Sequence, residues 1–172
     1  MSTRKYKFDW ELLGDLESGR PNMGLYTRVE VYRLMQFCFR DILEEKFGSE
    51  MSDEIFYKAG KLAGQQFYDH LLTGITEFND LVRELQRLFG DLRIGILRVE
   101  SASHEEGRFV FTVSEDLDCS GLPENDYEIC IYDEGLIAGI LERFCGVNFK
   151  VKEVDCWCTG DRTCRFLAEA EK

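Results

Sequence analysis

Apolar residues recur at helical spacing through three consecutive stretches in the first half of the chain. They stand three and four positions apart within 28–47, 53–72 and 77–89, which is the period of an amphipathic helix. Gly48 follows the first stretch and supplies a stop, and Ser52 carries the kind of side chain that caps a helix N-terminus. The pattern therefore predicts three helices in succession.

In the second half of the chain the apolar residues mostly alternate with polar ones, and one stretch returns to helical spacing. The alternating stretches predict four strands in two hairpins, with one helix between the hairpins. We expect the strands at 92–99, 108–113, 149–157 and 163–168, and the helix at 127–145. The glycine-containing stretch 5–26 predicts short extended pieces joined by turns. Together these elements predict an α+β fold in which helices pack against an antiparallel sheet.

Two of the expected helices carry glycines four positions apart, Gly60 with Gly64 and Gly135 with Gly139. A glycine inside a helix costs about 1 kcal/mol relative to alanine, so a compensating close approach is expected at these positions. Close packing of the helix on another helix or on the sheet would explain them. A ligand lying against the smooth surface is the alternative.

Composition narrows the class of protein. A chain of 172 residues that is 44% hydrophobic can bury one good core, so we expect a single domain over 1–172. Thirty-three acidic and 21 basic residues give a formal charge of −12, which disfavours direct binding of nucleic acid. The sequence has neither a stretch that approaches a membrane span nor a secretion leader, which predicts a cytoplasmic protein.

Seven cysteines need an explanation, because their odd number and the absence of a leader argue against a disulfide framework. Cys38 and Cys145 lie in helical stretches and are interpreted as small buried hydrophobic residues. The other five gather in the last third of the chain, at Cys119, Cys130, Cys156, Cys158 and Cys164. Thiols this dense beside a glycine turn predict a tetrahedral metal site, and zinc is the metal that suits them best.

The donors can be assigned only in part. Cys156 and Cys164 bracket the expected turn, and Cys130 lies near the start of a helix, where the helix dipole favours a thiolate. Glu153 could supply the fourth donor. In a regular strand, however, it would point away from Cys156, so either a bulge turns it inward or another thiol replaces it.

The alternative fourth donors are Cys119 and Cys158. Whichever residue completes the site, four protein donors leave no open position for a catalytic water. The metal would therefore have a structural role.

Four short motifs resemble the 4-vinyl reductase domain family. They are DCSGLP at 118–123, CxYxxGxxxG at 130–139, VxExxC at 151–156 and GDxxCxF at 160–166. The strongest part of the resemblance covers 119–166, and looser similarity upstream would make nearly the whole chain one such domain. The family's name comes from reduction of a vinyl group, but this sequence has neither a glycine-rich dinucleotide fingerprint nor a flavin signature.

The resemblance implies the fold shared by bacterial sensors of aromatic compounds and by TRAPP vesicle-tethering subunits. It also implies a bound small apolar or aromatic molecule such as a hydrocarbon, and a homodimer formed through the N-terminal region. Zinc in the aromatic sensors is held by three cysteines and one glutamate. Carried over position by position, this pattern gives Cys130, Glu153, Cys156 and Cys164 as ligands of a structural Zn²⁺.

An apolar pocket needs aromatic walls and one or two polar groups that orient the ligand. The aromatic candidates are Phe37, Phe56, Phe67, Phe109, Phe111 and Trp157. His70, on an expected helix, could orient a ligand, although a surface position is the simpler interpretation. His104 lies in a turn and is expected to be inert.

Three functions are compatible with these features. The leading hypothesis is a zinc-stabilised, non-enzymatic domain that binds or senses a small molecule. The second is a thiol-dependent enzyme or carrier that uses Cys119 and Cys158, whose thiols should then be partly exposed. The third is a pure protein-interaction subunit, which predicts a filled core.

Overall fold

The computed structural model describes residues 4–171, and the chain divides into two compact units, Met1–Cys38 and Phe39–Lys172. We call these the N-terminal and C-terminal units. The N-terminal unit contains the 3-10 helix η1 (Trp10–Leu13), the short helix α1 (Leu16–Gly19) and the first half of α2 (Val29–Phe47).

The prediction of extended pieces in the N-terminal unit was wrong, because short helices form there. The side chains of Asp9 and Asp15 accept hydrogen bonds from the backbone N–H groups of Glu11 and Ser18, respectively. These bonds cap η1 and α1, since they satisfy N–H groups that have no partner inside the helix.

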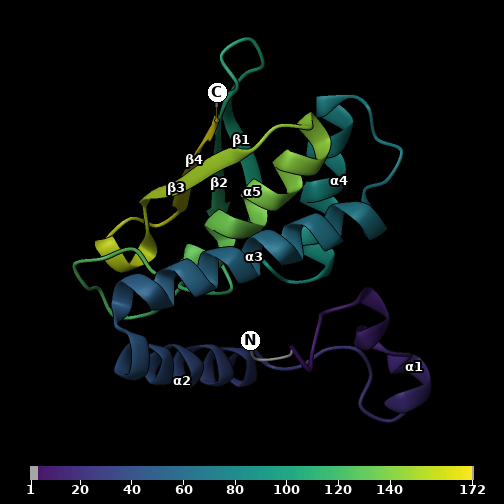
Figure 1. The fold of residues 1–172 in the computed structure, drawn as a ribbon, viewed down its shortest axis with the longest axis vertical. Helices are drawn as coiled ribbons and strands as arrows, with labels where there is room; N and C mark the ends of the chain where they lie inside the picture. The colour runs from purple at the N-terminus through teal and green to yellow at the C-terminus, as the bar shows by residue number, and fades with distance from the viewer. Residues whose placement is uncertain (1–3, 172) are drawn as a thin grey trace. The chain divides into compact units, whose positions relative to one another are not determined.

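The C-terminal unit confirms the α+β fold expected from the sequence. After α2 its elements are α3 (Ser49–Leu71), α4 (Phe78–Asp91), β1 (Ile96–Ser103), β2 (Arg108–Ser114), α5 (Ile131–Cys145), β3 (Phe149–Asp155), η2 (Trp157–Thr159) and β4 (Cys164–Ala170). The four strands form one antiparallel sheet in the order β1-β2-β4-β3 (Figure 1). The two hairpins of the sequence are thus joined through β2 and β4.

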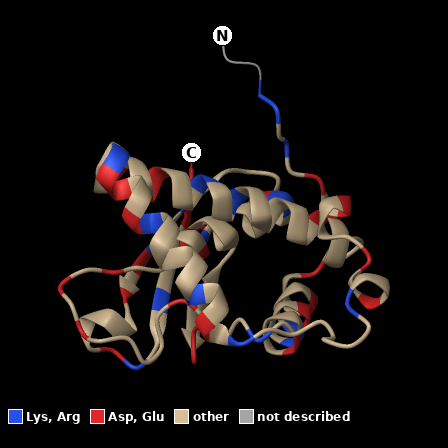
Figure 2. Ribbon diagram, turned by 90° about the horizontal axis from the view of Figure 1, so that it is seen from below, with Lys and Arg blue, Asp and Glu red and all other residues tan. Residues whose placement is uncertain are grey.

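Helix α5 packs on β3 and β4, α4 packs on β1, and α3 crosses the outer side of α5 (Figure 1). Side chains from the helix-covered face of the sheet form the core, at Phe109, Phe111, Val113, Phe166 and Ala168. The opposite face carries ion pairs such as Arg165 with Glu100. Figure 2 shows Lys and Arg interspersed with Asp and Glu along the helices and strands, so the basic residues do not gather on one element.

Two element boundaries differ from the sequence prediction for local reasons. Helix α3 begins directly after Gly48, which adopts a φ of 80°, and Ser52 is buried inside the helix instead of capping it. Strand β1 begins four residues late because α4 ends in a tight turn. Arg93 takes a φ of 61° there, and the Ile94 N–H bonds the Phe89 carbonyl.

The paired glycines lie where α3 and α5 cross. A Cβ atom at Gly60 or Gly64 would come within 3.0 Å of the α5 backbone, and one at Gly135 or Gly139 would meet the α3 backbone as closely. The two helices therefore touch backbone to backbone. This confirms close helix packing as the reason for these glycines.

No described helix is long and apolar enough to cross a membrane.

Both margins of the sheet receive hydrogen bonds from helix side chains. On β3, the Val151 N–H donates to the Tyr57 hydroxyl (3.3 Å) and the Glu153 N–H donates to the Glu134 carboxylate (2.8 Å). On β1, the Leu97 carbonyl accepts from the side-chain amide of Gln86 (3.2 Å). Two backbone N–H groups of β3 and one carbonyl of β1 are thereby partnered within the unit.

Candidate metal centre and ligand pocket

Four cysteine thiols meet at one end of the C-terminal unit, which we call the thiol end. Cys119 comes from the loop after β2, Cys130 from the residue before α5, Cys156 from the residue after β3, and Cys164 from the first position of β4. All four side chains are buried, and their Sγ atoms lie within 4.8 Å of one another.

The distances between these sulfur atoms fit a tetrahedral metal. Four sulfurs bound to zinc at about 2.3 Å stand about 3.8 Å apart. The Cys130 Sγ lies 3.8 Å from that of Cys164 and 4.0 Å from that of Cys156, while the Cys119 and Cys164 sulfurs are 3.2 Å apart. Small adjustments would therefore let the four thiols hold a soft divalent ion.

A tight turn places Cys119 in this group. The Asp116 carboxylate accepts hydrogen bonds from the backbone N–H groups of Asp118 (2.8 Å) and Cys119 (3.3 Å). An aspartate that bonds the backbone two and three residues ahead folds the chain back on itself. The sequence offered Cys119 only as an alternate donor, because spacing does not reveal this turn.

Glu153 borders the thiol cluster without belonging to the group of four. Phe149, Val151 and Glu153 alternate inward along β3, and the register with β4 then shifts between Glu153 and Asp155. This irregularity brings Cys156 to the side that Glu153 faces, as a bulge was expected to do. The Glu153 Oε2 atom accepts from the Cys130 N–H (3.1 Å), and its Oε1 atom, also buried, has no hydrogen-bond partner among the described residues.

The four thiols and Glu153 influence one another's pKa values. Hydrogen bonds from Cys119, Cys130 and Cys164 lower the pKa of Cys156, while the pKa of Cys130 is raised by its thiol neighbours. Burial, followed by the charge of Cys156, raises the pKa of Glu153 to about 9. Without a metal, the Cys156 thiolate thus accepts hydrogen bonds from its protonated neighbours. A divalent ion would replace those protons.

Cys158 lies outside the group of four. It sits in η2, fully buried, and burial raises its pKa to about 12. A second group of possible donors, Asp116, Cys130 and Asp133, shares one thiol with the first. Burial is the main reason that the pKa values of both aspartates are raised, that of Asp116 to about 7.

The six aromatic candidates for a pocket are dispersed. Phe37 is half-buried on α2, and Phe56 packs with Leu43 and Ile131 in a small separate cluster. Phe67, Phe109 and Phe111 belong to the main core, and half-buried Trp157 donates from its indole nitrogen to the Leu122 carbonyl (3.1 Å).

A small inner cavity lies between the helices and the sheet. It is lined by Leu85, Phe89, Leu97, Phe111, Ile137, Ile140 and Leu141, and its volume is about 10 Å³. This is room for one water molecule at most. The side chains around this cavity therefore fill the space that an aromatic ligand would need.

A larger pocket opens at the other end of the sheet, where the β1–β2 hairpin, the end of α5 and the ends of β3 and β4 meet. We call it the hairpin-end pocket, and its volume is about 520 Å³. Its lining includes His104, Phe109, Phe144, Cys145 and Phe149. Of the six aromatic candidates only Phe109 lines it, and His104, which was expected to be inert, forms part of its wall.

His70 lies elsewhere. It is exposed on α3, where its Nδ1 atom bonds the Gln66 carbonyl of the preceding turn (2.9 Å). The sequence could not single out Phe144 or Phe149, because each looks like an ordinary core residue until the fold brings the ends of α5 and β3 beside the hairpin.

Comparison with known proteins identifies the C-terminal region. A family model described as the V4R domain matches residues 109–170. The uncharacterized protein MJ0150 of Methanocaldococcus jannaschii is 26% identical over 119 residues, which cover 69% of this chain and 65% of that protein. The chain thus spans a little under two thirds of the length of this relative.

Solved structures share the fold at low sequence identity. The phenol-responsive sensory domain of the transcription activator PoxR, determined with phenol, matches 86% of this chain and 76% of its own, with a TM-score of 0.66 and 14% identity. A trafficking protein particle complex subunit 3 from Naegleria fowleri, covalently bound to palmitic acid, matches 84% and 95%, with a TM-score of 0.66 and 12% identity.

A vinyl-4-reductase family protein from M. jannaschii matches 87% of this chain and 85% of its own, with a TM-score of 0.62 and 19% identity. The resemblance drawn from the cysteine and glycine motifs is thereby confirmed, with the V4R domain model matching residues 109–170 of this chain.

Proposed function

We propose that this protein is a non-enzymatic, small-molecule-binding domain whose fold is clamped by a structural Zn²⁺. The observation that carries the proposal is the group of four buried thiols with nearly tetrahedral spacing. Four thiols that converge at distances close to those around zinc favour a bound soft divalent ion, because thiolates are ligands that zinc prefers.

The proposed ligands are Cys119, Cys130, Cys156 and Cys164. Glu153 then acts as a neighbour that holds the Cys130 backbone in place through the 3.1 Å hydrogen bond. This assignment differs from the one that the resemblance implies, because Cys119 takes the place of Glu153 as the fourth ligand. When bound, the ion would supply positive charge that joins β3, β4 and the start of α5.

Metal content and cobalt spectra test the assignment. The purified protein should contain about one zinc per chain, and Co²⁺ substituted for zinc should show the absorption of four thiolate bonds. Cys119→Ser should reduce the thiolate-to-cobalt absorption by about a quarter, whereas Glu153→Gln should leave it unchanged. The reverse result would assign Glu153 as the ligand, and a metal-free protein would end the proposal.

The hairpin-end pocket supports the binding of a small molecule. Its volume of about 520 Å³ lies within the usual range of ligand sites, about 300–1,000 Å³, and four of its lining residues carry aromatic rings. The PoxR sensory domain, which shares the fold, is described as phenol-responsive. We therefore propose a small molecule with an aromatic or apolar body as the ligand.

The two competing functions receive less support. A thiol-dependent enzyme would need an accessible nucleophile, yet Cys119 and Cys158 are both 0% exposed. A pure interaction subunit is compatible with the filled inner cavity but leaves the hairpin-end pocket without a role. Native mass spectrometry of the purified protein would report a co-purified small molecule and the metal together.

We also propose a homodimer formed through α2, in a cytoplasm whose reducing conditions keep the thiols free. Seven large apolar side chains of this helix are exposed, namely Val29, Val31, Leu34, Met35, Phe39, Ile42 and Phe47. Exposed apolar residues this close together are typical of an interface. Light scattering should give twice the chain mass, and Leu34→Glu with Met35→Glu should give a monomer. A wild-type protein that is monomeric at high concentration would refute the dimer.

A further inference from the structure

Four aromatic residues line the hairpin-end pocket, namely His104, Phe109, Phe144 and Phe149, and Phe78 packs against them. The ring of Phe109 stacks on Phe78 with centroids 5.0 Å apart, and His104 meets Phe78 edge-on at 4.8 Å. Phe149 lies 5.8 Å from Phe109, and Phe144 lies 6.2 Å from Phe78. Five rings from α4, α5, β2, β3 and the hairpin therefore pack together at this end. Phe109 and Phe149 are buried, so exposed His104 and half-buried Phe144 supply most of the aromatic surface that the pocket reaches.

The hairpin is held over this surface by a close backbone contact. Gly107 adopts a φ of 62°, and a Cβ atom there would stand 2.6 Å from the Cβ of Ala170. Its carbonyl accepts a hydrogen bond from the Ala170 N–H (2.8 Å). The turn that carries His104 is thereby fixed to the end of β4, so the pocket wall is built by the fold.

The charge of the pocket is one-sided. Glu105 and Glu106 of the hairpin line it, and the lining residues include neither lysine nor arginine. Arg108, which follows in sequence, is paired instead with Glu169 across β2 and β4. The whole chain adds to this bias with its formal charge of −12. Carboxylates beside a partly apolar wall attract an organic cation.

We propose that the hairpin-end pocket binds an organic ammonium ion that carries an aromatic or apolar body. His104, Phe144 and the other apolar lining residues would contact the apolar body, and the two glutamates would supply charge at the rim. This inference deepens the proposed function, on which it rests, by naming the charge of the ligand. Neutral phenols and hydrocarbons should bind the same pocket more weakly.

A matched pair of probes tests the charge. 2-Phenylethylammonium and neutral 2-phenylethanol have the same aromatic body, and their affinities can be compared by isothermal titration calorimetry at low salt. We expect the ammonium ion to bind about tenfold more tightly. Equal affinities would overturn the inference but leave the proposed function standing. If neither probe binds at millimolar concentration, both fail.

Cysteine alkylation reports where the probe binds. Cys145 is half-buried and lines the pocket, whereas Cys38 is exposed and serves as an internal reference. Saturating 2-phenylethylammonium should slow the reaction of Cys145 with iodoacetamide several-fold and leave Cys38 unchanged, as measured by peptide mass spectrometry. Binding without protection of Cys145 would place the ligand elsewhere and overturn the proposal.

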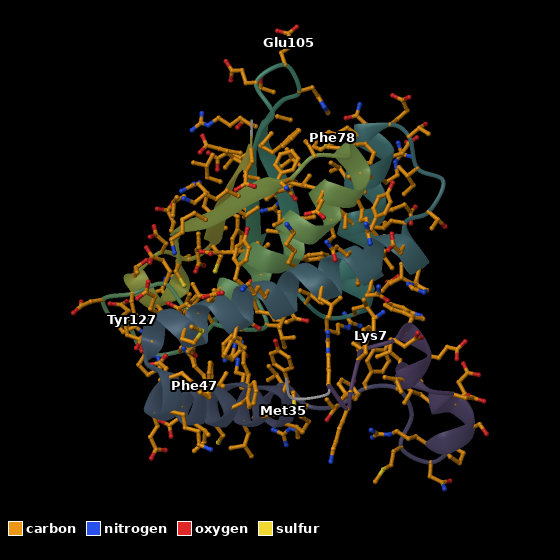
Figure 3. The ribbon with its side chains drawn as sticks, viewed as in Figure 1. Lys7, Met35, Phe47, Phe78, Glu105 and Tyr127 are labelled. Carbon is orange, nitrogen blue, oxygen red and sulfur yellow. The ribbon has the colours of Figure 1, made fainter. Side chains whose placement is uncertain are left out.

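Charge variants complete the test. Glu105→Gln with Glu106→Gln changes exposed side chains only and should weaken 2-phenylethylammonium about three- to tenfold, without effect on 2-phenylethanol. The control is Glu124→Gln with Asp126→Asn, which removes the same charge beside Tyr127, far from Glu105 and Phe78 in Figure 3. Equal losses in both double variants would mean that general charge attracts the cation, and the proposed site would be wrong.

Discussion

The two ends of the sheet are built from the same elements and differ in almost every other respect. Helix α5 begins at the thiol end and ends at the hairpin-end pocket, a length of about 22 Å for its 15 residues. At the thiol end, buried acids and thiols crowd together. At the pocket end, aromatic side chains border a space that opens to solvent. The proposed metal and the proposed ligand would therefore act at separate ends.

Removal of the proposed metal should have the largest effect on the stability of the thiol end relative to the pocket end. We expect a strong chelator to lower the unfolding temperature by about 10 °C or more, because the thiol end then loses the ion that joins β3, β4 and α5. Hydrogen exchange should increase first near Cys156 and Cys164. Cys38→Ser should behave like the wild type in both buffers, and a protein equally stable with and without chelator would contradict a structural metal.

Substitutions at the crossing of α3 and α5 should have the next largest effect on stability. This contact fixes the position of α5, which runs from the thiol end to the hairpin-end pocket. Gly64→Ala would force a Cβ into the α5 backbone and should destabilise the protein by about 3 kcal/mol in urea unfolding. Gly90→Ala is the control, since a Cβ there meets nothing within 4 Å. It should stabilise α4 by up to about 1 kcal/mol. Equal effects of the two substitutions would show that the crossing is loose.

A smaller effect is expected at Tyr57, whose hydroxyl links α3 to β3 between the two ends. Its removal in Tyr57→Phe should cost about 0.5–1 kcal/mol at neutral pH. Burial raises the pKa of Tyr57 in the folded protein. The stability that its hydroxyl contributes is therefore complete below the unfolded-state pKa near 10, and it is lost as pH rises through the higher folded-state pKa.

Urea unfolding at pH 7 and pH 10.5 measures both parts of this prediction. Tyr57→Phe should lose less stability between these pH values than the wild type does. Tyr127→Phe, which changes an exposed ring, should match the wild type throughout. An unchanged alkaline loss in Tyr57→Phe would show that another group causes it.

The sequence predicted the residues of the thiol end more completely than those of the hairpin-end pocket. Helical and alternating periods predicted the helices and strands, because a covered face repeats along each element. They missed the late start of β1, since Arg93 adopts a conformation that is rare for a residue with a side chain. They also misplaced the start of α3, where backbone geometry at Gly48 outweighed the capping preference of Ser52.

The site residues show the same limit. Motif resemblance predicted Cys130, Cys156 and Cys164, which the structure brings together, but only the turn at Asp116 reveals how close Cys119 lies. The hairpin-end pocket could not be predicted from local pattern. Its wall joins residues from distant parts of the chain, and His104 looked like an ordinary turn residue.

The hydrogen bonds along β3 and β1 have a consequence for aggregation. An open sheet normally offers unpaired backbone groups to which a strand of another molecule can add. Here Tyr57 and Glu134 occupy those groups on one margin, and Gln86 occupies a carbonyl on the other. These bonds leave fewer backbone groups free for edge-to-edge polymerisation, most of all along β3.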